Sequence, residues 1–258
     1  MKVIIFFTYG ISLNDWKTSG LLEREVKLYN YLNEKYNVKF VFITYGDATD
    51  LDVLKNYNHI EVIPIYKHFN KSKYKFFEII KSFTYSFRLR KIISMDNYIL
   101  KTNQLWGSWI PLLIKLKNGN PLIVRTGYDL LDFKRKEKAP NYKIFFYKLI
   151  TRFAIKFSDK YLVTSSGDLD RIKKEFSTRD RVLEKLSNWV EFPTLENKSR
   201  FSDRIISVGR LEQQKNYPYL IKSFANSEIE IDIVGQGSKK EELVSLSQSH
   251  NAKINFLG

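Results

Sequence analysis

The chain of 258 residues contains no cysteine, three histidines and six prolines. The lack of cysteine excludes disulfide bonds and thiolate metal sites, and it is compatible with a reducing compartment. No apolar run approaches the roughly 18 residues that a membrane-spanning helix needs. The first residues, 1–8, become polar too early for a signal peptide and predict a buried strand instead. These absences favour a cytoplasmic protein that is soluble or lies on the inner face of a membrane.

Acidic residues are also scarce, and the net charge is +15. From Arg204 onward there are seven Lys/Arg against six Asp/Glu, so the first 203 residues carry 36 against 22. This asymmetry indicates a partner rich in phosphate, nucleic acid or anionic lipid for the N-terminal part, unless an AT-rich genome alone inflates the lysine content. No nucleic-acid motif is present, and the basic residues lie beside aromatic helix faces. We therefore expect no nucleic-acid partner.

Short apolar runs alternate with longer amphipathic segments along the chain, which predicts an α/β fold with parallel sheets and crossover helices. Such sheets bind ligands beyond the carboxyl ends of their strands. The expected strands are 3–7, 38–43, 60–65, 98–100, 122–124, 161–163, 205–208, 229–234 and 254–257. The expected helices are 21–34, 76–93, 109–116, 142–157, 168–176, 219–224 and 239–250.

A domain boundary is expected where periodicity is lost and proline and polar residues appear. This places a first domain at 1–187, a linker at 188–203 and a second segment at 204–258. The second segment has 55 residues, well below the roughly 100 typical of a domain. We expect it to be the first half of a doubly wound domain.

The segment Ser207–Asn216 carries the chemistry that points most directly to a ligand. An apolar strand delivers Gly209 and then places Arg210 and Lys215 five residues apart at a turn. Glycine permits close backbone approach, a guanidinium binds phosphate with two parallel hydrogen bonds, and an ammonium adds a point charge. These residues are suited to holding a diphosphate at the edge of a parallel sheet.

Together with its neighbours, this segment resembles the donor-binding domain of glycosyltransferase family 4, whose members are retaining enzymes of the GT-B fold with two Rossmann-like domains. Four segments carry the resemblance by their order and spacing: 208–216, 220–225, 231–237 and 254–258. It implies that Arg210, Lys215 and Gly209 contact the diphosphate of a sugar nucleotide. It also implies that no metal or other cofactor is needed, because protein cations replace the metal.

Other positions match the family less specifically. Gly235 and Gly237 would lie beside the nucleotide, with a plain turn as the alternative. Ser19 and Gly20 would border the acceptor, with a surface loop as the alternative. The three histidines fall in no catalytic pattern.

Arg125 and Asp129 follow a buried strand at a point where family members place acceptor or catalytic contacts, often including a histidine that this chain lacks. We expect Arg125 on the acceptor side and Asp129 in a catalytic role, with helix capping by Asp129 as an equal alternative. The serines at 165–166 resemble a serine-containing turn that faces the cleft, or form an ordinary helix N-cap.

Two basic stretches rich in aromatic residues remain. Residues 66–91 contain eight Lys/Arg and a single acid, Glu78, and we expect them to contact an anionic membrane surface. Residues 142–160 place aromatic side chains on one helix face beside a basic stripe. We expect that face to pack on the core, with membrane contact as the alternative.

The resemblance also implies a continuation that is absent here, namely a serine, a glutamate–glycine pair and a second glutamate. We therefore expect a C-terminally truncated glycosyltransferase that transfers a sugar to a saccharide or lipid-linked acceptor in cell-surface polysaccharide or glycolipid synthesis. A second chain would complete the donor site. The alternative is a non-catalytic acceptor-binding or partner subunit of a split enzyme.

Overall fold

The computed structural model describes residues 1–93, 97–178, 182–190 and 204–258. The chain divides into two compact units, Met1–Glu191 and Phe192–Gly258, and each is treated by itself. Most of the expected linker, from 191 to 203, lies outside the described residues.

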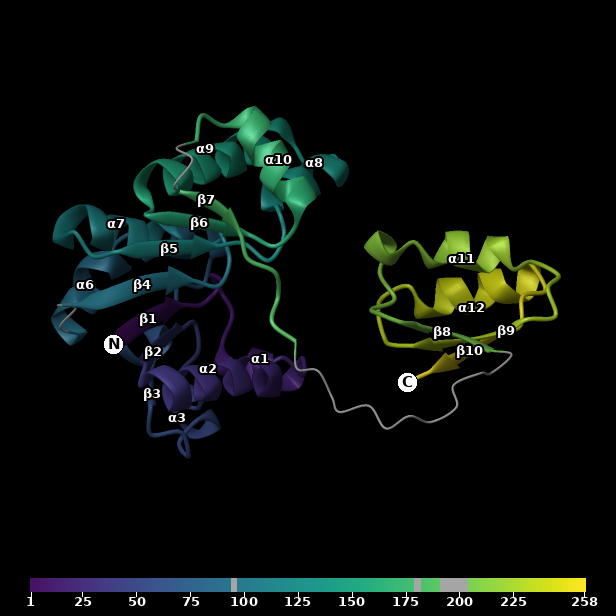
Figure 1. Cartoon of the computed structure of the whole chain (residues 1–258), viewed down its shortest axis with the longest axis horizontal. Coiled ribbons are helices and arrows are strands. Elements are labelled where there is room, and N and C mark those ends of the chain that lie inside the picture. Colours follow the sequence, from purple (N-terminus) through teal and green to yellow (C-terminus); the bar gives the residue numbers. More distant parts are fainter. Residues whose placement is uncertain (94–96, 179–181, 191–203) are drawn as a thin grey trace. The chain divides into compact units, whose positions relative to one another are not determined.

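The first unit is built on a parallel sheet of seven strands in the order β3-β2-β1-β4-β5-β6-β7 (Figure 1). The strands are β1 (Lys2–Phe6), β2 (Lys39–Thr44), β3 (Ile60–Pro64), β4 (Tyr98–Thr102), β5 (Leu122–Arg125), β6 (Lys160–Val163) and β7 (Leu183–Lys185). Because all of them are parallel, their carboxyl ends lie along one edge, which is where ligands of open α/β sheets bind.

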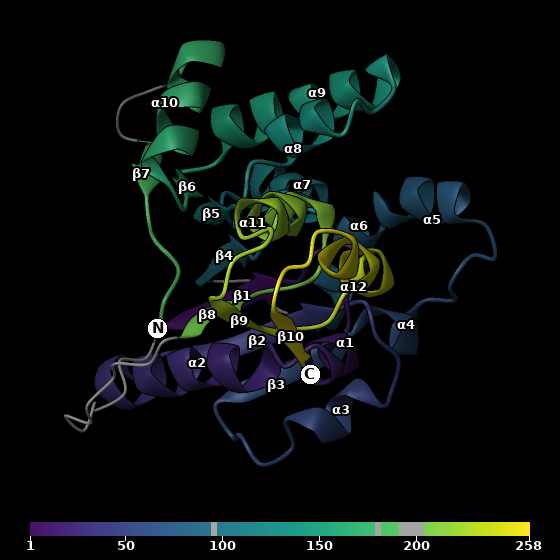
Figure 2. The same ribbon diagram turned by 90° about the vertical axis from the view of Figure 1, so that its right-hand side faces the viewer.

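Helices cover both faces of this sheet. They are α1 (Leu13–Thr18), α2 (Leu22–Tyr36), α3 (Asp50–Val53), α4 (Ile65–His68), α5 (Lys75–Ser82), α6 (Tyr85–Ile92), α7 (Trp109–Asn118), α8 (Leu130–Lys136), α9 (Asn141–Phe157) and α10 (Ser166–Glu175). Figure 2 places α2 on one face and α5, α6, α7 and α9 on the other.

Two hydrophobic clusters follow from the alternation of side chains along the strands. In β1, Ile4 and Phe6 enter the cluster beneath α6, α7 and α9, whereas Val3 and Ile5 enter the cluster beneath α1 and α2. Burial on both faces explains why this strand is a continuous apolar run. The cluster beneath α1 and α2 contains no buried residue of β5, β6 or β7. Among the described residues, the side chains that these three strands place on the α1–α2 face of the sheet therefore belong to neither hydrophobic cluster.

The structure corrects the expected single helix at 76–93, which is two helices, α5 and α6. The helix is interrupted around Phe83, whose ring stacks on Trp109 at a centroid distance of 5.5 Å. The Ser82 and Thr84 hydroxyls donate to the backbone carbonyls of Ile79 (2.6 Å) and Lys81 (2.7 Å), which competes with regular helix hydrogen bonding. The short helices α1, α3, α4 and α8 and the three-residue strand β7 were not predicted, and β4 extends two residues beyond the expected strand.

The structure corrects in part the expectation that the aromatic face of residues 142–160 packs on the core, because Phe146 and Phe157 pack against it and the other aromatic residues of that face do not. Phe145 is 69% exposed, and Tyr142 and Phe153 are exposed as well. The buried side of α9 carries mostly aliphatic residues, including Ile150, Ala154 and Ile155. The helix has two apolar stripes, and the aliphatic one packs toward the sheet.

The second unit has a parallel sheet of three strands in the order β10-β9-β8. Its elements are β8 (Arg204–Val208), the 3₁₀ helix η1 (Gln213–Lys215), α11 (Tyr217–Ser223), β9 (Glu230–Val234), α12 (Lys240–Ser249) and β10 (Ile254–Leu257). Leu211, Tyr217, Ile221, Ile231, Ile233 and Leu243 form its core. Within the described ranges of the chain, no helix is long and apolar enough to cross a membrane.

Candidate functional site

In the second unit, the turns after β8 and β9 are joined through their backbones. The Gly209 N–H donates to the Val234 carbonyl (3.0 Å), and the Leu211 N–H donates to the Gln236 carbonyl (2.9 Å). The Leu211 carbonyl in turn accepts from the Lys239 N–H at 3.0 Å. These bonds hold the two turns side by side at the carboxyl edge of the sheet.

This close approach accounts for the two glycines after β9. A Cβ at Gly235 would lie 2.1 Å from the Gly209 carbonyl oxygen, and one at Gly237 would lie 2.4 Å from the Leu211 carbonyl oxygen. Gly235 also has a φ of +151°, which few other residues adopt. Backbone packing is thus a sufficient reason for both glycines, and their contact with a nucleotide stays a prediction.

Arg210 and Lys215 lie in the turn after β8, as the sequence predicts. Both are exposed, and neither forms an ion pair with another described residue. The stem of Lys215 lies against Gly209, with Cε 3.6 Å from the position that a Cβ would occupy there. The structure therefore brings the side chain of Lys215 to the backbone that carries Arg210, and both cations remain available to an anion.

Sequence reasoning missed the residue that closes this turn. Glu212 accepts hydrogen bonds from the N–H and the hydroxyl of Ser238, both at 3.0 Å. These bonds, with a smaller effect of the nearby Arg210 and Lys239 charges, hold the pKa of Glu212 below its usual range. A hollow of about 510 Å³ lined by Ser207, Lys215 and Tyr219 lies beside the turn. The signal for this residue in the sequence was an acidic side chain in the turn that follows the expected strand 205–208.

In the first unit, Ser19 and Gly20 form the turn between α1 and α2. The Ser19 hydroxyl donates to the Asp15 carbonyl at 2.7 Å. Gly20 has a φ of +71° and open space around it. The positive φ alone explains the glycine, and the role of both residues on the acceptor side stays a prediction.

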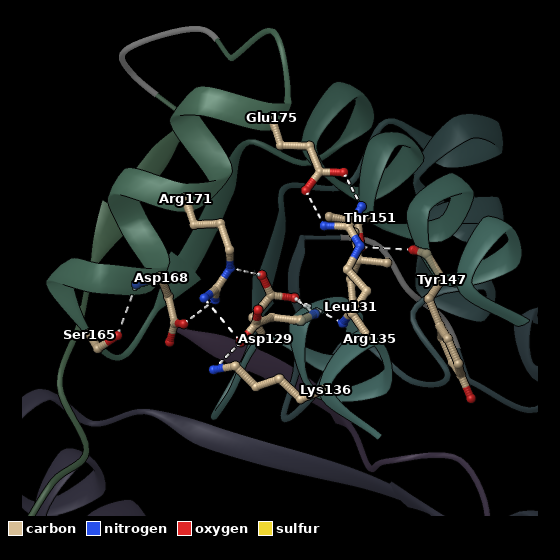
Figure 3. Close-up of polar contacts among 11 residues, drawn as sticks. Asp129, Leu131, Arg135, Lys136, Tyr147, Thr151, Ser165, Asp168, Arg171 and Glu175 are labelled. Carbon is tan, nitrogen blue, oxygen red and sulfur yellow. Dashed lines mark hydrogen bonds and ion pairs between the residues drawn. The ribbon is translucent and has the colours of Figure 1, made fainter. Parts of the chain in front are cut away.

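Asp129 lies at the N-terminus of α8, where its carboxylate is fully engaged (Figure 3). Its Oδ1 accepts from the Leu131 N–H (2.9 Å) and the Asp132 N–H (3.2 Å), which is N-cap geometry. Its Oδ2 is 3.0 Å from Nε of Arg171. The side chain is 7% exposed. The structure thus realises the capping alternative, and a catalytic role for Asp129 stays a prediction that no observation here tests.

Arg171 is the centre of this network, and sequence reasoning missed it. Its guanidinium contacts Asp129, Asp132 (3.2 Å) and Asp168, and so joins α10 to α8. The Ser165 hydroxyl accepts from the Asp168 N–H at 3.0 Å, so the serine turn after β6 is an N-cap (Figure 3). Nearby, Arg135 forms two hydrogen bonds of 2.6 Å with Glu175.

Arg125 ends β5, and its guanidinium donates to Asn188 Oδ1 at 2.5 Å. Lys101, on the adjacent strand β4, is a second cation at this edge that sequence reasoning missed. Its ammonium donates to Asn103 Oδ1 at 3.2 Å. Burial, reinforced by the charge of Arg125 and opposed by that of Glu25, lowers the pKa of Lys101 to about 8. The signal for Lys101 in the sequence was a lysine at the carboxyl end of the expected apolar strand 98–100.

In the part of the chain that the structure describes, no group of three or more His, Asp or Glu side chains is placed to hold a metal ion. The residues expected on the acceptor side belong to the first unit and those expected on the donor side belong to the second.

Comparison with known proteins shows where this architecture recurs. Residues 193–258 match the family described as "Glycosyl transferases group 1". The chain is 30% identical over 126 residues to N-acetylgalactosamine-N,N'-diacetylbacillosaminyl-diphospho-undecaprenol 4-alpha-N-acetylgalactosaminyltransferase of Campylobacter jejuni. That alignment covers 44% of this chain and 34% of the relative, so the matched part spans about one third of that protein.

Solved structures resemble the chain over its whole length. Anabaena HepE in complex with UDP-glucose matches with a TM-score of 0.64 and 14% identity, covering 100% of this chain and 69% of HepE. Sucrose-phosphate synthase from Thermosynechococcus elongatus matches with a TM-score of 0.71 and 12% identity, covering 100% of this chain and 70% of the synthase. The predicted GT-B-like α/β fold is therefore confirmed. The chain resembles the group 1 glycosyltransferases in sequence over residues 193–258 and has a glycosyltransferase fold throughout.

Proposed function

We propose that the chain acts in glycosyl transfer, moving a sugar from a nucleoside-diphosphate sugar to a saccharide or lipid-linked acceptor in the synthesis of cell-surface polysaccharide or glycolipid. The observation that carries this proposal is the turn after β8. It lies within the matched residues 193–258, and it presents Arg210 and Lys215 with no ion-pair partner among the described residues.

The chemistry of these two cations suits the departure of a nucleoside diphosphate. The bond between the sugar and the β-phosphate breaks, and the diphosphate gains negative charge as it leaves. Fixed cations that already point to this position stabilise the charge without reorganising. We propose that Arg210 and Lys215 do this in place of a metal ion, and that the anomeric configuration of the sugar is retained.

The acceptor is proposed to be lipid-linked. The name of the Campylobacter jejuni relative describes a diphospho-undecaprenol substrate, and the relative is 30% identical over the matched part. A lipid-linked acceptor would require the protein to work at a membrane surface, and the first unit has a surface suited to this.

That surface includes α5 and α6, within the predicted stretch 66–91. Phe76 is 69% exposed, and Phe77, Ile80 and Phe87 are also exposed. Glu78, the single acid of the stretch, is buried and accepts hydrogen bonds from Tyr85 and the Ser72 N–H. The exposed surface of α5 and α6 is therefore apolar and basic without an exposed acid, which is the composition that binds anionic lipid headgroups.

Helix α9 lies on the same face of the sheet as α5 and α6 (Figure 2). Phe83 stacks on Trp109 (5.5 Å), Trp109 contacts Trp106 (5.1 Å), and Trp106 contacts Phe146 of α9 (6.1 Å). This chain of rings, of which Trp109, Trp106 and Phe146 belong to or pack against the core, links α5–α6 to α9. Helix α9 has no acidic residue and carries Lys143, Lys148, Arg152 and Lys156. We propose that both elements contact an anionic bilayer.

Transfer is tested by incubating the chain with radiolabelled UDP- and GDP-sugars and a diphospho-polyprenol saccharide in vesicles. We expect label in the lipid fraction, and expect it to fall at least tenfold in Arg210→Ala but not in Lys222→Ala, which removes an exposed lysine of α11. Hydrolysis alone, or equal transfer in both variants, contradicts the proposal. Transfer that appears only after a second chain is added supports a split enzyme.

Membrane contact is tested separately by co-sedimentation with phosphatidylcholine vesicles with and without 30% phosphatidylglycerol. Each exposed Phe contributes about 1.5–3 kcal/mol when buried, so Phe76→Ser with Phe77→Ser is expected to weaken partitioning at least tenfold. Tyr219→Ser, an exposed aromatic of the second unit, serves as the control. Binding that does not depend on phosphatidylglycerol, or that the control reduces equally, contradicts the assignment.

A further inference from the structure

The carboxyl edge of β4 and β5 holds two cations, Lys101 and Arg125, that each donate to an asparagine and have no carboxylate partner among the described residues. In the parallel register, Leu100 pairs with Leu122 and Lys101 with Ile123. Leu100, Leu122 and Val124 are buried beneath α6, α7 and α9. Because side chains alternate along a strand, Lys101 and Arg125 lie on the opposite face. Strand spacing and rise place their Cα atoms about 8 Å apart.

Lys101 is half-buried, yet it has no ion-pair partner of its own among the described residues. The nearest acid that acts on it is Glu25 of α2, whose Oε1 is engaged with Arg24 at 2.7 Å. Among the described residues, the Lys101 ammonium donates to Asn103 Oδ1 alone. Desolvating a cation without a carboxylate is costly, and the neighbouring Arg125 charge adds to this cost.

Asn103 contributes a third donor at the same place. Its Oδ1 accepts from Lys101, so its amide nitrogen is the group left to donate, and that nitrogen is buried with no hydrogen-bond partner in the described structure. Buried amide donors are nearly always paired in folded proteins. An ammonium, an unpaired amide and a guanidinium at one sheet edge have the chemistry of an anion site, because each offers N–H donors and two carry positive charge.

This end of the sheet face is partly exposed. The hydrophobic cluster beneath α1 and α2 includes no residue of β5, and Ile123 and Arg125 are half-exposed. The turn that holds Ser19 and Gly20 leads into α2, whose first turns include Glu25, so the expected acceptor-side turn lies at the same edge.

We propose that Lys101, Asn103 and Arg125 form a subsite for a phosphate or diphosphate group of the acceptor. The assignment to the acceptor rests on the proposed glycosyl transfer, whereas the binding of the anion does not. Lys101 and Arg125 supply the charge, and Asn103 orients the ammonium and donates to a phosphate oxygen. This subsite differs from the cations at Arg210 and Lys215, which belong to the second unit.

The test is calorimetry with inorganic pyrophosphate on the full chain carrying Arg210→Ala and Lys215→Ala, so that the donor side cannot contribute. We expect binding to persist in this background and to weaken at least tenfold on adding Lys101→Met or Arg125→Gln. The control is Lys39→Met, which removes an exposed lysine from the amino edge of the same sheet. No binding in the background, or equal binding in all variants, overturns the subsite.

A second readout avoids substitutions in the first unit. Acetic anhydride labels lysine amines, and peptide mass spectrometry gives the labelling rate of each lysine. Pyrophosphate is expected to slow the labelling of Lys101 at least fivefold and to leave Lys39 unchanged. An unchanged rate at Lys101 overturns the proposal. If the subsite binds pyrophosphate while Arg210→Ala leaves sugar transfer intact, the proposed donor role fails and the subsite stands.

Discussion

Replacing Asp129 separates its capping contacts from any direct part in chemistry. Asp129→Ala removes both N-cap hydrogen bonds and the contact with Arg171. Loss of an N-cap costs about 0.5–2 kcal/mol. Loss of one ion pair costs about 0.5–1 kcal/mol here, because Arg171 is 29% exposed and keeps Asp132 and Asp168. The free energy of unfolding should therefore fall by about 1–3 kcal/mol.

Asp129→Asn keeps an oxygen that can accept from the Leu131 and Asp132 N–H groups and loses only the charge opposite Arg171. The expected loss is about 0.5–1 kcal/mol. For a unit of this size, 1 kcal/mol corresponds to about 2–4 °C in Tm. We expect Tm to fall by about 2–12 °C in Asp129→Ala and by about 1–4 °C in Asp129→Asn, measured by calorimetry.

Asp170 provides the matched control, since it is an exposed aspartate of α10 with no hydrogen bond or ion pair to another described side chain. Asp170→Ala should change the stability by less than about 0.5 kcal/mol. Equal Tm values for Asp129→Ala and wild type would refute the capping argument. If Asp129→Asn keeps its Tm and loses sugar transfer, the carboxylate acts in chemistry beyond its structural contacts.

Three further predictions concern other parts of the molecule. Gly237→Ala should destabilise the second unit by about 1–3 kcal/mol in denaturant unfolding, because its Cβ would lie 2.4 Å from the Leu211 carbonyl oxygen. The control, Gly167→Ala, should be neutral or stabilising, because the nearest atom to its Cβ would be 4.0 Å away. Hydrogen bonds from Arg135 hold the pKa of Glu175 below its usual range. The stabilising effect of Glu175 is therefore present above about pH 4.5 and is lost as the pH falls through the lower folded-state pKa. Glu175→Gln should flatten the acid limb of the curve of unfolding free energy against pH, and an unchanged limb would contradict this. Burial lowers the pKa of Lys101 to about 8, and a bound anion should raise it again. Pyrophosphate binding near pH 9 should therefore take up a proton. Calorimetry in different buffers would show this as a binding enthalpy that depends on the ionisation enthalpy of the buffer.

The sequence predicts much of the fold because buried strands are its strongest signal. Strands β1, β2 and β3 are apolar runs between turns, and each lies within two residues of its expected bounds. Helix α1 and strand β7 escape prediction because their length is too short for periodicity to emerge. The division of residues 76–93 depends on tertiary contacts, since Phe83 leaves the helix to stack on Trp109.

The orientation of α9 could not be derived from periodicity. Both of its stripes are apolar, and a hydrophobic pattern alone does not say which one meets the sheet. The structure buries the stripe of β-branched and small residues, Ile150, Ala154 and Ile155, and leaves the aromatic residues Tyr142, Phe145 and Phe153 exposed.

The sequence predicted the candidate site where the residues that act together are close to one another in the sequence. Arg210 and Lys215 share one turn, so their spacing sufficed. Lys101 and Arg125 lie 24 positions apart, and only the parallel register of β4 and β5 brings them to one edge. Arg171 was missed for the same reason, because its partners on α8 are about 40 residues away.

The central claim is that Arg210 and Lys215 hold the diphosphate of a sugar nucleotide, and calorimetry with UDP and GDP on the full chain tests it most directly. Hydrogen bonds to a charged group contribute about 1.5–3 kcal/mol, so Arg210→Ala and Lys215→Ala should each weaken binding by about 10- to 150-fold. Lys222→Ala should leave it unchanged. Measurable affinity that is equal in wild type, Arg210→Ala and Lys215→Ala would contradict the account.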